Sequence, residues 1–280
     1  MGKRQVGIVK ELFRYPVKSM LGERLGELDV GKDGVVGDRA WALHEDNGRV
    51  VTAKKWANML EFRAAYDSPP TSSDLTPLRI VLPDGRSIHA ADAGASEAIS
   101  AVLGRKVRLV SVRPGEHARA EIDPQTVFGD LAVADVLPPF TEQTLPDHFA
   151  LLKGTFFDSA AIHLLATASL AHMRSLIGED ARLDPRRFRP NIVVETDPRI
   201  TGFVEDEWVG GTLEVADSVR IIKIEPALRC VMTTHRQQDL PRDLRILRTA
   251  ARQHQAKLGV FAWIGQPGRV RLGDQVWLVT

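Results

Sequence analysis

Apolar and polar residues alternate in short runs over the first 112 positions of the chain. A period of two residues is typical of β-strands that bury one face. Asp46-Asn47-Gly48 and Asp84-Gly85 favour tight turns between such strands, and Pro16 marks the end of the first run. The pattern therefore predicts strands over residues 5–17 and 106–112, and hairpins over residues 39–54 and 78–89.

The second half of the chain mixes helical and strand patterns. Residues 159–177 carry apolar side chains near helical spacing, which predicts a helix that Gly178 ends. A basic helix is expected over residues 243–257, ending at Gly259. Strands are predicted over residues 189–196, 211–216, 219–225, 260–264 and 270–279, the last two as a closing pair around Gln266-Pro267-Gly268.

Between these halves, residues 113–145 are rich in proline and mixed charge, which indicates a domain junction or a surface loop. Many short strands with few helices favour a mainly β fold of barrel architecture. The acidic run Glu205-Asp206-Glu207 is interpreted as a solvated loop in preference to a metal site.

Composition narrows the class of protein. The chain has 280 residues, a formal net charge of +1 and one cysteine. Near-neutral charge argues against bulk nucleic-acid binding, and a single cysteine argues against a secreted disulfide scaffold. The first residues lack the apolar run of a signal peptide, and no apolar stretch reaches transmembrane length. We therefore expect a cytoplasmic enzyme that binds neither nucleic acid nor membranes.

The single cysteine, Cys230, follows Arg229. A neighbouring cation favours the thiolate, which can act as a nucleophile, a soft metal ligand or a sulfur carrier. A lone cysteine is more often a small buried apolar residue. The chain offers no P-loop, no Gly-x-Ser-x-Gly and no His-Glu-x-x-His sequence that would indicate another chemistry.

Four blocks spread over nearly the whole chain carry a resemblance to a known family. They are Tyr15-Pro16-Val17-Lys18-Ser19; Gly37-Asp38-Arg39-Ala40-Trp41 with Val51-Thr52-Ala53-Lys54; Arg187-Phe188-Arg189-Pro190-Asn191-Ile192-Val193-Val194; and Arg229-Cys230 with Thr233-Thr234 and a final Gly268-Arg269-Val270-Arg271-Leu272-Gly273-Asp274. In this order they resemble the MOSC family, the molybdenum-cofactor sulfurase C-terminal domain proteins. Within that family the likeness is to the mitochondrial amidoxime-reducing component and its bacterial relatives.

The resemblance implies a MOSC-type β-barrel over residues 125–280 and a smaller N-terminal β domain over residues 1–120. It also implies the molybdenum cofactor, an anionic, flat pterin with a terminal phosphate and a dithiolene that grips the metal. Cys230 would be the molybdenum ligand. The residues that would bind the cofactor are Lys18, Ser19, Arg39, Ser159, Arg189, Asn191 and Arg229. Ser159 would do so at the start of the predicted helix, a suitable anion site.

The same resemblance predicts a molybdenum-dependent oxidoreductase that reduces N-hydroxylated small molecules. Its electrons would come from a separate protein, such as a ferredoxin, a flavin reductase or a cytochrome b5-like protein. Leu228 and Phe261 depart from the family pattern, which often has serine and a tyrosine-like residue at these positions. Sulfur transfer by a Cys230 persulfide and a non-catalytic cofactor carrier remain as alternative functions. Arg39, Lys18 and Asn191 also have ordinary readings as an ion-pair partner, an exposed lysine and a turn cap.

Overall fold

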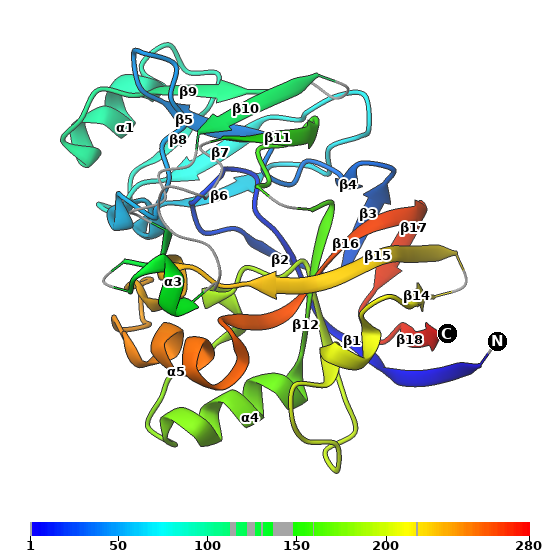
Figure 1. Cartoon of the computed structure of the whole chain (residues 1–280). Coiled ribbons are helices and arrows are strands. Elements are labelled where there is room, and N and C mark those ends of the chain that lie inside the picture. The colour runs from blue at the N-terminus through cyan, green and yellow to red at the C-terminus, as the bar shows by residue number, and fades with distance from the viewer. Residues whose placement is uncertain are drawn as a thin grey trace.

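The computed structural model describes residues 2–112, 116–121, 127–129, 131–136, 148–158, 160–216 and 218–280. Within these residues the chain is mainly β, as the sequence predicts, and a few helices flank the strands (Figure 1). Two sets of sheets lie one above the other in Figure 1, with the first half of the chain mostly above and the second half mostly below.

Seven strands form a closed barrel in the lower part. Each strand pairs with the next, and a final pairing between β1 and β13 closes the ring. Around the barrel the order is β13 (Ile192–Glu195), β12 (Ile162–Ala166), β16 (Lys257–Gln266), β15 (Val219–Leu228), β14 (Thr212–Val215), β18 (Gln275–Val279) and β1 (Lys3–Arg14). The short β2 (Glu23–Leu25) extends the sheet from β1. Closure leaves no free edge in the ring itself.

Alternation along the strands fills the barrel. In β15, Val219, Ile221 and Ile224 are buried while Arg220 and Lys223 are exposed. The inward residues of the other strands join them in one apolar cluster that also contains Trp208, whose side chain is almost fully buried. Inward apolar and outward polar residues are what a strand with one buried face requires.

The first barrel strand comes from the N-terminal end of the chain. β1 runs antiparallel to both β13 and β18, and the two chain ends lie side by side, with Gly2 N donating to Thr280 O at 3.1 Å. Residues 1–120 therefore supply one strand of the barrel as well as the upper sheets. The predicted division at residues 1–120 and 125–280 stays a prediction as a domain boundary.

The upper part consists of small antiparallel sheets. They are β6-β7-β8 (Arg63–Tyr66, Leu78–Val81, Ser87–His89), β5-β9 (Trp41–His44, Arg108–Ser111) and β10-β11 (His117–Glu121, His148–Lys153), with helix α1 (Ala95–Leu103) and the 3₁₀ turn η1 (Ala57–Glu61). A separate apolar cluster that includes Trp56, Phe62 and Ile80 holds them together. The sheet β17-β3-β4 (Gly268–Arg271, Glu27–Gly31, Gly34–Val35) joins both ends of the chain.

Helices α4 (Thr167–Ile177) and α5 (Arg245–His254) pack together beside the barrel, below it in Figure 1. Leu170, Met173, Ile246 and Ala250 meet Leu165 of β12 in a third apolar cluster. The remaining short elements are α3 (Val133–Val136) and the 3₁₀ turns η2 (Pro185–Arg187), η3 (Val204–Trp208) and η4 (Val231–Thr234). Among the described residues, no helix is both long enough and apolar enough to cross a membrane.

Several predicted elements are confirmed, among them the strand near the N-terminus, the hairpin at Asp84-Gly85 and the end of α4 at Gly178. The helix predicted over residues 159–177 is wrong in its first part, because residues 162–166 form β12. The basic helix ends at Gln255 in a left-handed conformation, and Gly259 lies inside β16. β16 and β18 are not paired with each other, because β18 lies between β14 and β1.

Two further predictions need correction. The turn at Asp46-Asn47-Gly48 exists, and backbone bonds from Glu45 N to Arg49 O at 2.9 Å and from Val51 N to Leu43 O at 2.7 Å join its two sides, but the returning residues form no strand and β5 pairs over its length with β9. The stretch predicted as irregular, residues 113–145, contains β10 and α3 among its described residues. Residues 113–115, 122–126, 130 and 137–145 of that stretch lie outside the described residues.

Candidate functional site

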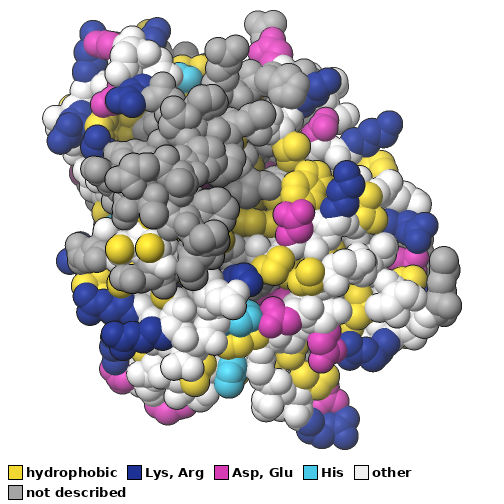
Figure 2. All heavy atoms as spheres, in the orientation of Figure 1, with side chains coloured by type: hydrophobic (Ala, Val, Ile, Leu, Met, Phe, Trp, Pro, Cys, Tyr) yellow, Lys and Arg dark blue, Asp and Glu magenta, His cyan; other side chains and the backbone are white. Residues whose placement is uncertain are grey.

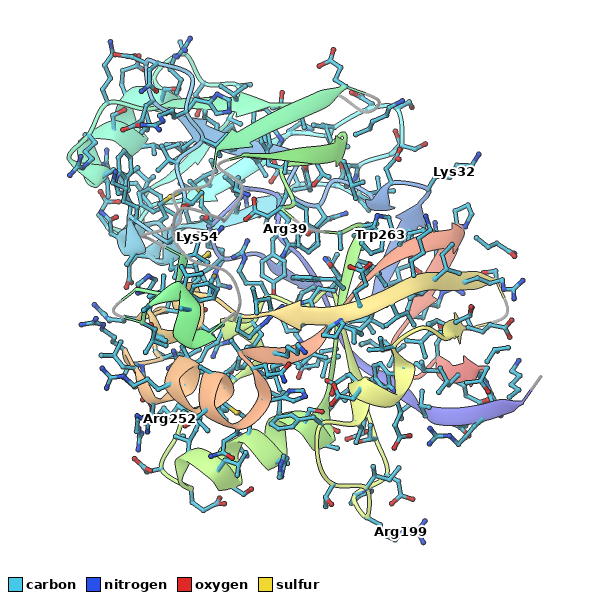
Figure 3. All side chains as sticks on the ribbon, viewed as in Figure 1. Lys32, Arg39, Lys54, Arg199, Arg252 and Trp263 are labelled. Carbon is cyan, nitrogen blue, oxygen red and sulfur yellow. The ribbon has the colours of Figure 1, made fainter. Side chains whose placement is uncertain are left out.

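The largest collection of functional groups lines a cavity of roughly 220 Å³ between the upper sheets and the barrel. Its described walls come from chain segments far apart in sequence. The lining residues are Lys18, Ser19, Arg39, Thr52, Lys54, Val127, Phe128, Phe156, Phe157, Asp158, His163, Arg187, Phe188, Arg189, Leu228, Arg229, Cys230, Met232, Thr233 and Phe261. Figure 3 shows Arg39 and Lys54 in the interior between the two parts, whereas Arg199 and Arg252 lie at the periphery.

Three of the lining residues have an unusual backbone conformation. Ser19, Arg39 and Arg189 have φ angles of 66°, 50° and 58°, in the left-handed region. A side chain with a Cβ pays a conformational cost there, and such residues tend to gather where a site must be built. Eight non-glycine residues among those described have positive φ, and three of them meet at this cavity, which marks it as a constrained region.

The cavity concentrates positive charge. Six basic side chains and one carboxylate, Asp158, are among its described lining residues. Surface charges elsewhere are of both signs and are interspersed on the visible face in Figure 2. Folding therefore creates the positive site locally, since the whole chain carries a net charge of only +1.

Two of the guanidinium groups are incompletely satisfied. Arg189 donates from Nη1 to the carbonyl of Met20, and Arg229 donates from Nη1 to Phe188 O at 3.2 Å. The Nη2 atoms of both residues are buried and have no hydrogen-bond partner among the described residues. Because a buried, unpaired cation is costly, the arrangement is suited to an anion that enters the cavity and accepts these bonds.

Burial shapes the protonation of both groups. It lowers the pKa of Arg189 to about 10, with a further lowering by the charge of Arg39. Burial likewise lowers the pKa of Arg229, while the neighbouring Cys230 raises it. Both guanidinium groups remain protonated at neutral pH, and the lowered pKa values show how unfavourable their environment is without a counterion.

Asp158 lies between two lysines. Lys18 pairs with Asp158 Oδ1 and donates to Phe156 O at 2.6 Å, and Lys54 Nζ is 3.2 Å from Asp158 Oδ2. Burial alone would raise the pKa of Asp158, but the two lysines outweigh it and hold the pKa below its ordinary value. This carboxylate offsets one of the two lysine charges, and Arg39 is paired with Asp38, so the charges of Arg189 and Arg229 are left to a ligand.

Cys230 lies between the end of β15 and η4, and it is partly exposed toward the cavity. The segment around it is fixed by hydrogen bonds from Thr233 Oγ1 to Cys230 O at 3.0 Å and from Arg229 Nε to Ala227 O at 3.0 Å. A partly exposed thiol in an electropositive pocket has the setting of a reactive or ligating cysteine, which distinguishes it from an inert apolar one.

Aromatic rings form the apolar side of the cavity. Phe157 and Phe261 meet edge to face at 5.8 Å, and the Arg39 and Arg229 guanidinium carbons lie 4.0 Å and 5.1 Å from their ring centres. His163 packs against Phe261 at 5.2 Å, and burial holds its pKa well below the ordinary value, so this ring is neutral. The cavity can therefore hold a flat ligand with an anionic end.

Most of the predicted site residues come together here, namely Lys18, Ser19, Arg39, Arg189, Arg229 and Cys230. Asn191 does not. Its side chain is fully buried, with Nδ2 donating to Phe13 O at 3.3 Å and Oδ1 accepting from His163 N at 3.1 Å. It joins β1 to β12 and is not among the residues that line the cavity, so its predicted contact with a pterin stays a prediction.

Ser159 lies outside the described residues. The argument that placed it at a helix N-terminus is wrong, because α4 begins at Thr167. Lys54, Asp158 and His163 also line the cavity and were not predicted to do so. Lys54 ends one of the recognised blocks and Asp158 directly precedes Ser159, and these positions were the signal that could have indicated them.

Two further charged residues are buried. Arg187, the first residue of the third block, is 1% exposed and donates to the carbonyls of Arg182, His235 and Pro241 at 2.8, 3.1 and 2.6 Å. Glu205, expected in a solvated acidic run, is buried and accepts a bond from Ala166 N at 2.6 Å at the start of α4. Among the described residues, no group of three or more His, Cys, Asp or Glu side chains is arranged to hold a metal ion.

Comparison with known families agrees with this geometry. The family model for the MOSC domain matches residues 152–277, and that for the MOSC N-terminal beta barrel domain matches residues 6–112. The chain belongs to the MOSC-domain family. The cavity of this MOSC protein receives residues from both matched regions, with Lys18, Arg39 and Lys54 from the first and Arg189, Arg229 and Cys230 from the second.

Curated relatives share its length at low identity. Mitochondrial amidoxime-reducing component 1 of Mus musculus is 26% identical and aligns with 99% of this MOSC chain and 83% of its own, and the Homo sapiens protein is 26% identical over 99% and 84%. Mitochondrial amidoxime reducing component 2 of Bos taurus is 23% identical over 82% and 67%. Among solved structures, the YuaD protein from Bacillus subtilis is 12% identical, with a TM-score of 0.49 over 99% of this chain and 97% of its own.

MOSC domains are associated with the molybdenum cofactor, and the residues of this cavity fit such a group. The unpartnered Nη2 atoms of Arg189 and Arg229 can donate to an anionic phosphate, and the aromatic walls suit a flat pterin. Cys230 offers a sulfur atom to the cavity, a soft ligand of the kind that suits such a metal.

Proposed function

We propose that this protein is a molybdenum-cofactor-dependent oxidoreductase that reduces N-hydroxylated small molecules. The observation that carries the proposal is the pairing, in one cavity of a MOSC protein, of buried unpartnered guanidinium groups with the only thiol of the chain. The names of the curated relatives, which specify amidoxime reduction, support the choice of substrate class.

The protein would contribute binding and orientation. Arg39, Arg189 and Arg229, together with Lys18, would hold the anionic end of the cofactor, and Cys230 would provide the thiolate ligand. When bound, the cofactor supplies a molybdenum centre that can exchange two electrons. Phe157 and Phe261 would keep water away from one wall of the site, which strengthens electrostatic interactions inside it.

The reaction balances with two electrons and two protons. An amidoxime, R–C(NH₂)=N–OH, gives the amidine R–C(NH₂)=NH and one water when its N–O bond breaks. Lys54 is the residue placed to hold a proton on this side of the cavity, with its Nζ beside Asp158. Burial would lower the pKa of Lys54, but Asp158 and Cys230 raise it, so the amine stays charged and can donate a hydrogen bond to an oxygen.

The electrons would come from another protein. One cysteine is too few to ligate an iron–sulfur cluster, so this sequence does not encode an electron-transfer centre of that kind. A ferredoxin, a flavin reductase or a cytochrome b5-like protein is the class of donor we propose. A cytoplasmic location is likewise a proposal.

The test is the content and activity of protein made in a molybdenum-sufficient host. We expect molybdenum and a fluorescent pterin close to one per chain, and reduction of an aromatic amidoxime with a chemical reductant. Arg189→Ala and Lys18→Ala should lose cofactor and keep the fold, because each removes a charge-assisted bond that contributes roughly ten- to a hundredfold in affinity. Folded protein that carries neither metal nor pterin, even after reconstitution, would rule the proposal out.

Sulfur transfer is the second candidate, because Cys230 is a partly exposed thiol beside Arg229. Intact-mass measurement after incubation with a cysteine-desulfurase donor separates the two functions. A thiolate that ligates a metal is blocked from attacking a sulfur donor. A stable gain of one sulfur atom on Cys230, passed on to an acceptor with no molybdenum present, would favour sulfur transfer over reduction.

A further inference from the structure

Tyr15 lies behind the cavity and contacts two of its arginines. The guanidinium carbons of Arg39 and Arg189 are 4.8 Å and 4.2 Å from the centre of the Tyr15 ring. The tyrosine is 2% exposed and is not among the lining residues, so it does not touch a ligand in the cavity. Its ring also stacks on Phe13, with ring centres 6.2 Å apart.

The backbone ties Tyr15 to the same two arginines. Tyr15 N donates to Asp38 Oδ1 at 2.7 Å, and Arg39 N donates to Tyr15 O at 2.7 Å. Asp38 also forms an ion pair with Arg39, whose Nη2 donates to Arg189 O at 3.1 Å. The Arg39 and Arg189 segments are thus connected both by this direct bond and by the ring of Tyr15, which contacts the two guanidinium groups.

This arrangement has to hold two like charges close together in a buried place. Repulsion would separate the two guanidinium groups, as the lowering of the Arg189 pKa by Arg39 shows. The face of an aromatic ring carries negative potential and attracts a cation. Burial raises the pKa of Tyr15 above its ordinary value, against the opposing effect of Arg189 and Arg39, so the phenol stays neutral and the attraction comes from the ring face.

We propose that Tyr15 is a positioning residue, whose ring holds the Arg39 and Arg189 guanidinium groups in the orientation that binds the anionic end of the cofactor. The inference rests on the proposed function in naming that ligand. Tyr15 Oη is buried and has no hydrogen-bond partner in the described part of the chain, so we assign the positioning role to the ring and not to the hydroxyl.

The negative potential of the ring face can be reduced while the shape of the side chain at position 15 is nearly kept. Tyr15→Phe should bind the ligand as the wild type does, and phenylalanines with increasing numbers of ring fluorines at position 15 should bind progressively less well, because fluorine withdraws the negative potential of the face. With two cation–ring contacts at stake, we expect a loss of roughly tenfold or more for the most fluorinated ring. Tyr15→Leu should fall at least as far.

Phe13→Leu is the matched control. Phe13 belongs to the same small apolar cluster as Tyr15 and is 6% exposed, but no arginine lies over its ring among the contacts described. It should lose stability without losing ligand. Melting temperature is measured alongside each binding constant so that a general loss of folding is recognised, and the fluorinated series keeps the test valid if Tyr15→Leu does not fold.

Two ligands are measured on each variant: retained pterin, by fluorescence after release, and inorganic phosphate binding to the cofactor-free protein, by calorimetry. A graded loss of either with ring fluorination supports the role of Tyr15. Wild-type protein that binds phosphate but no pterin would defeat the proposed function and leave this inference to be judged on phosphate. Unchanged binding across the series, an equal loss in Phe13→Leu, or a wild type that binds neither ligand would overturn it.

Discussion

The most unusual side-chain environments in this protein are those of its buried charged residues. Arg39, Arg189 and Arg229 are each at most 8% exposed, and only Arg39 has a carboxylate partner, Asp38. Buried cations without partners destabilise a fold, so their presence indicates that binding of an anion and not stability accounts for them. Cys230 lies beside Arg229 and lines the same cavity, so it belongs to the same site.

Cys230→Ser tests the role of the thiol. The variant should fold with a melting temperature close to that of the wild type, because a partly exposed side chain of nearly the same size is changed. Reduction of an amidoxime should be lost, since a serine oxygen is a harder ligand than a thiolate. Turnover and thermal unfolding are measured together. An inert packing cysteine predicts the opposite, a small loss of stability with full activity, and that result would remove Cys230 from the mechanism.

Glu205 gives a prediction about pH. Burial raises its pKa from 4.5 to about 6, against the hydrogen bonds from Ser169 and Ala166 N that lower it. The folded protein therefore binds more protons than the unfolded chain between these values, and its stability falls as pH rises from about 4.5 to 6, by about 2 kcal/mol. Glu205→Gln should remove this slope, as measured by urea unfolding across the range.

The control for that measurement is Glu207→Gln. Glu207 lies in the same 3₁₀ turn, but its side chain is 64% exposed and pairs only with the exposed Arg4. It should leave the slope as it is in the wild type. If Glu205→Gln and Glu207→Gln give the same pH dependence as the wild type, the buried carboxylate is not responsible for it.

The sequence blocks indicated which residues gather, but not the surroundings of each. Lys18, Arg39, Arg189 and Cys230 line one cavity, and their roles toward a cofactor stay predictions. Asn191 lies away from the cavity, because an amide serves equally well to satisfy buried backbone groups, and residue type alone does not tell which is needed.

At the scale of elements, β12 shows why local pattern fails. Ile162, Leu164 and Ala166 enter the barrel core, while Leu165 packs against α4 and α5, so both faces of this strand are buried. A strand buried on both faces has no alternation, and a short apolar run of this kind cannot be told from a helix by periodicity. The half-buried strands β7 and β15, by contrast, keep the alternation and were predicted.

The seam between β1 and β13 yields a prediction about a single glycine. A Cβ on Gly7 would lie 2.3 Å from Glu195 O and 2.6 Å from Val194 Cγ1, across the pairing that closes the barrel. The nearest atom belongs to the backbone of Glu195 and cannot rotate away as the end of a side chain could. Gly7→Ala should therefore force β1 and β13 apart and destabilise the protein by about 1–3 kcal/mol. Urea unfolding should show the lower midpoint.

Gly26→Ala is the control for that substitution. No atom lies within 4 Å of a Cβ at Gly26, and its φ is not positive. The free energy of unfolding of Gly26→Ala should stay within about 0.5 kcal/mol of the wild-type value, as for an ordinary surface substitution. Equal midpoints for Gly7→Ala and the wild type would show that the seam opens without cost, contrary to the packing described.

At the scale of the whole molecule, the two ends of the sequence build one barrel and the site lies where that barrel meets the upper sheets. Lys18 and Arg39 follow β1 along the chain, so the strand that closes the barrel also leads directly into the cavity. The resemblance groups β1 with the N-terminal unit of residues 1–120, and the pairing between residues near positions 9 and 194 leaves no local signal in the sequence. Long-range register of this kind is set by the packing of the folded barrel.

Removal of residues 2–14 should therefore unfold the second half of the chain and not only the first. Without β1, both β13 and β18 become free edges, and the core loses Val6, Val9 and Leu12. We expect an aggregated or unfolded product by gel filtration and circular dichroism.

A circular permutant provides the control. Because β1 and β18 are adjacent and antiparallel, with Thr280 N donating to Gly2 O at 3.1 Å, residues 2–14 can follow Thr280 through a short Asn-Gly turn. That permutant should fold as a monomer with the same spectrum as the wild type. Two results would show that the barrel does not depend on β1. One is a deletion variant that stays folded, and the other is a permutant that unfolds or aggregates as much as the deletion variant does.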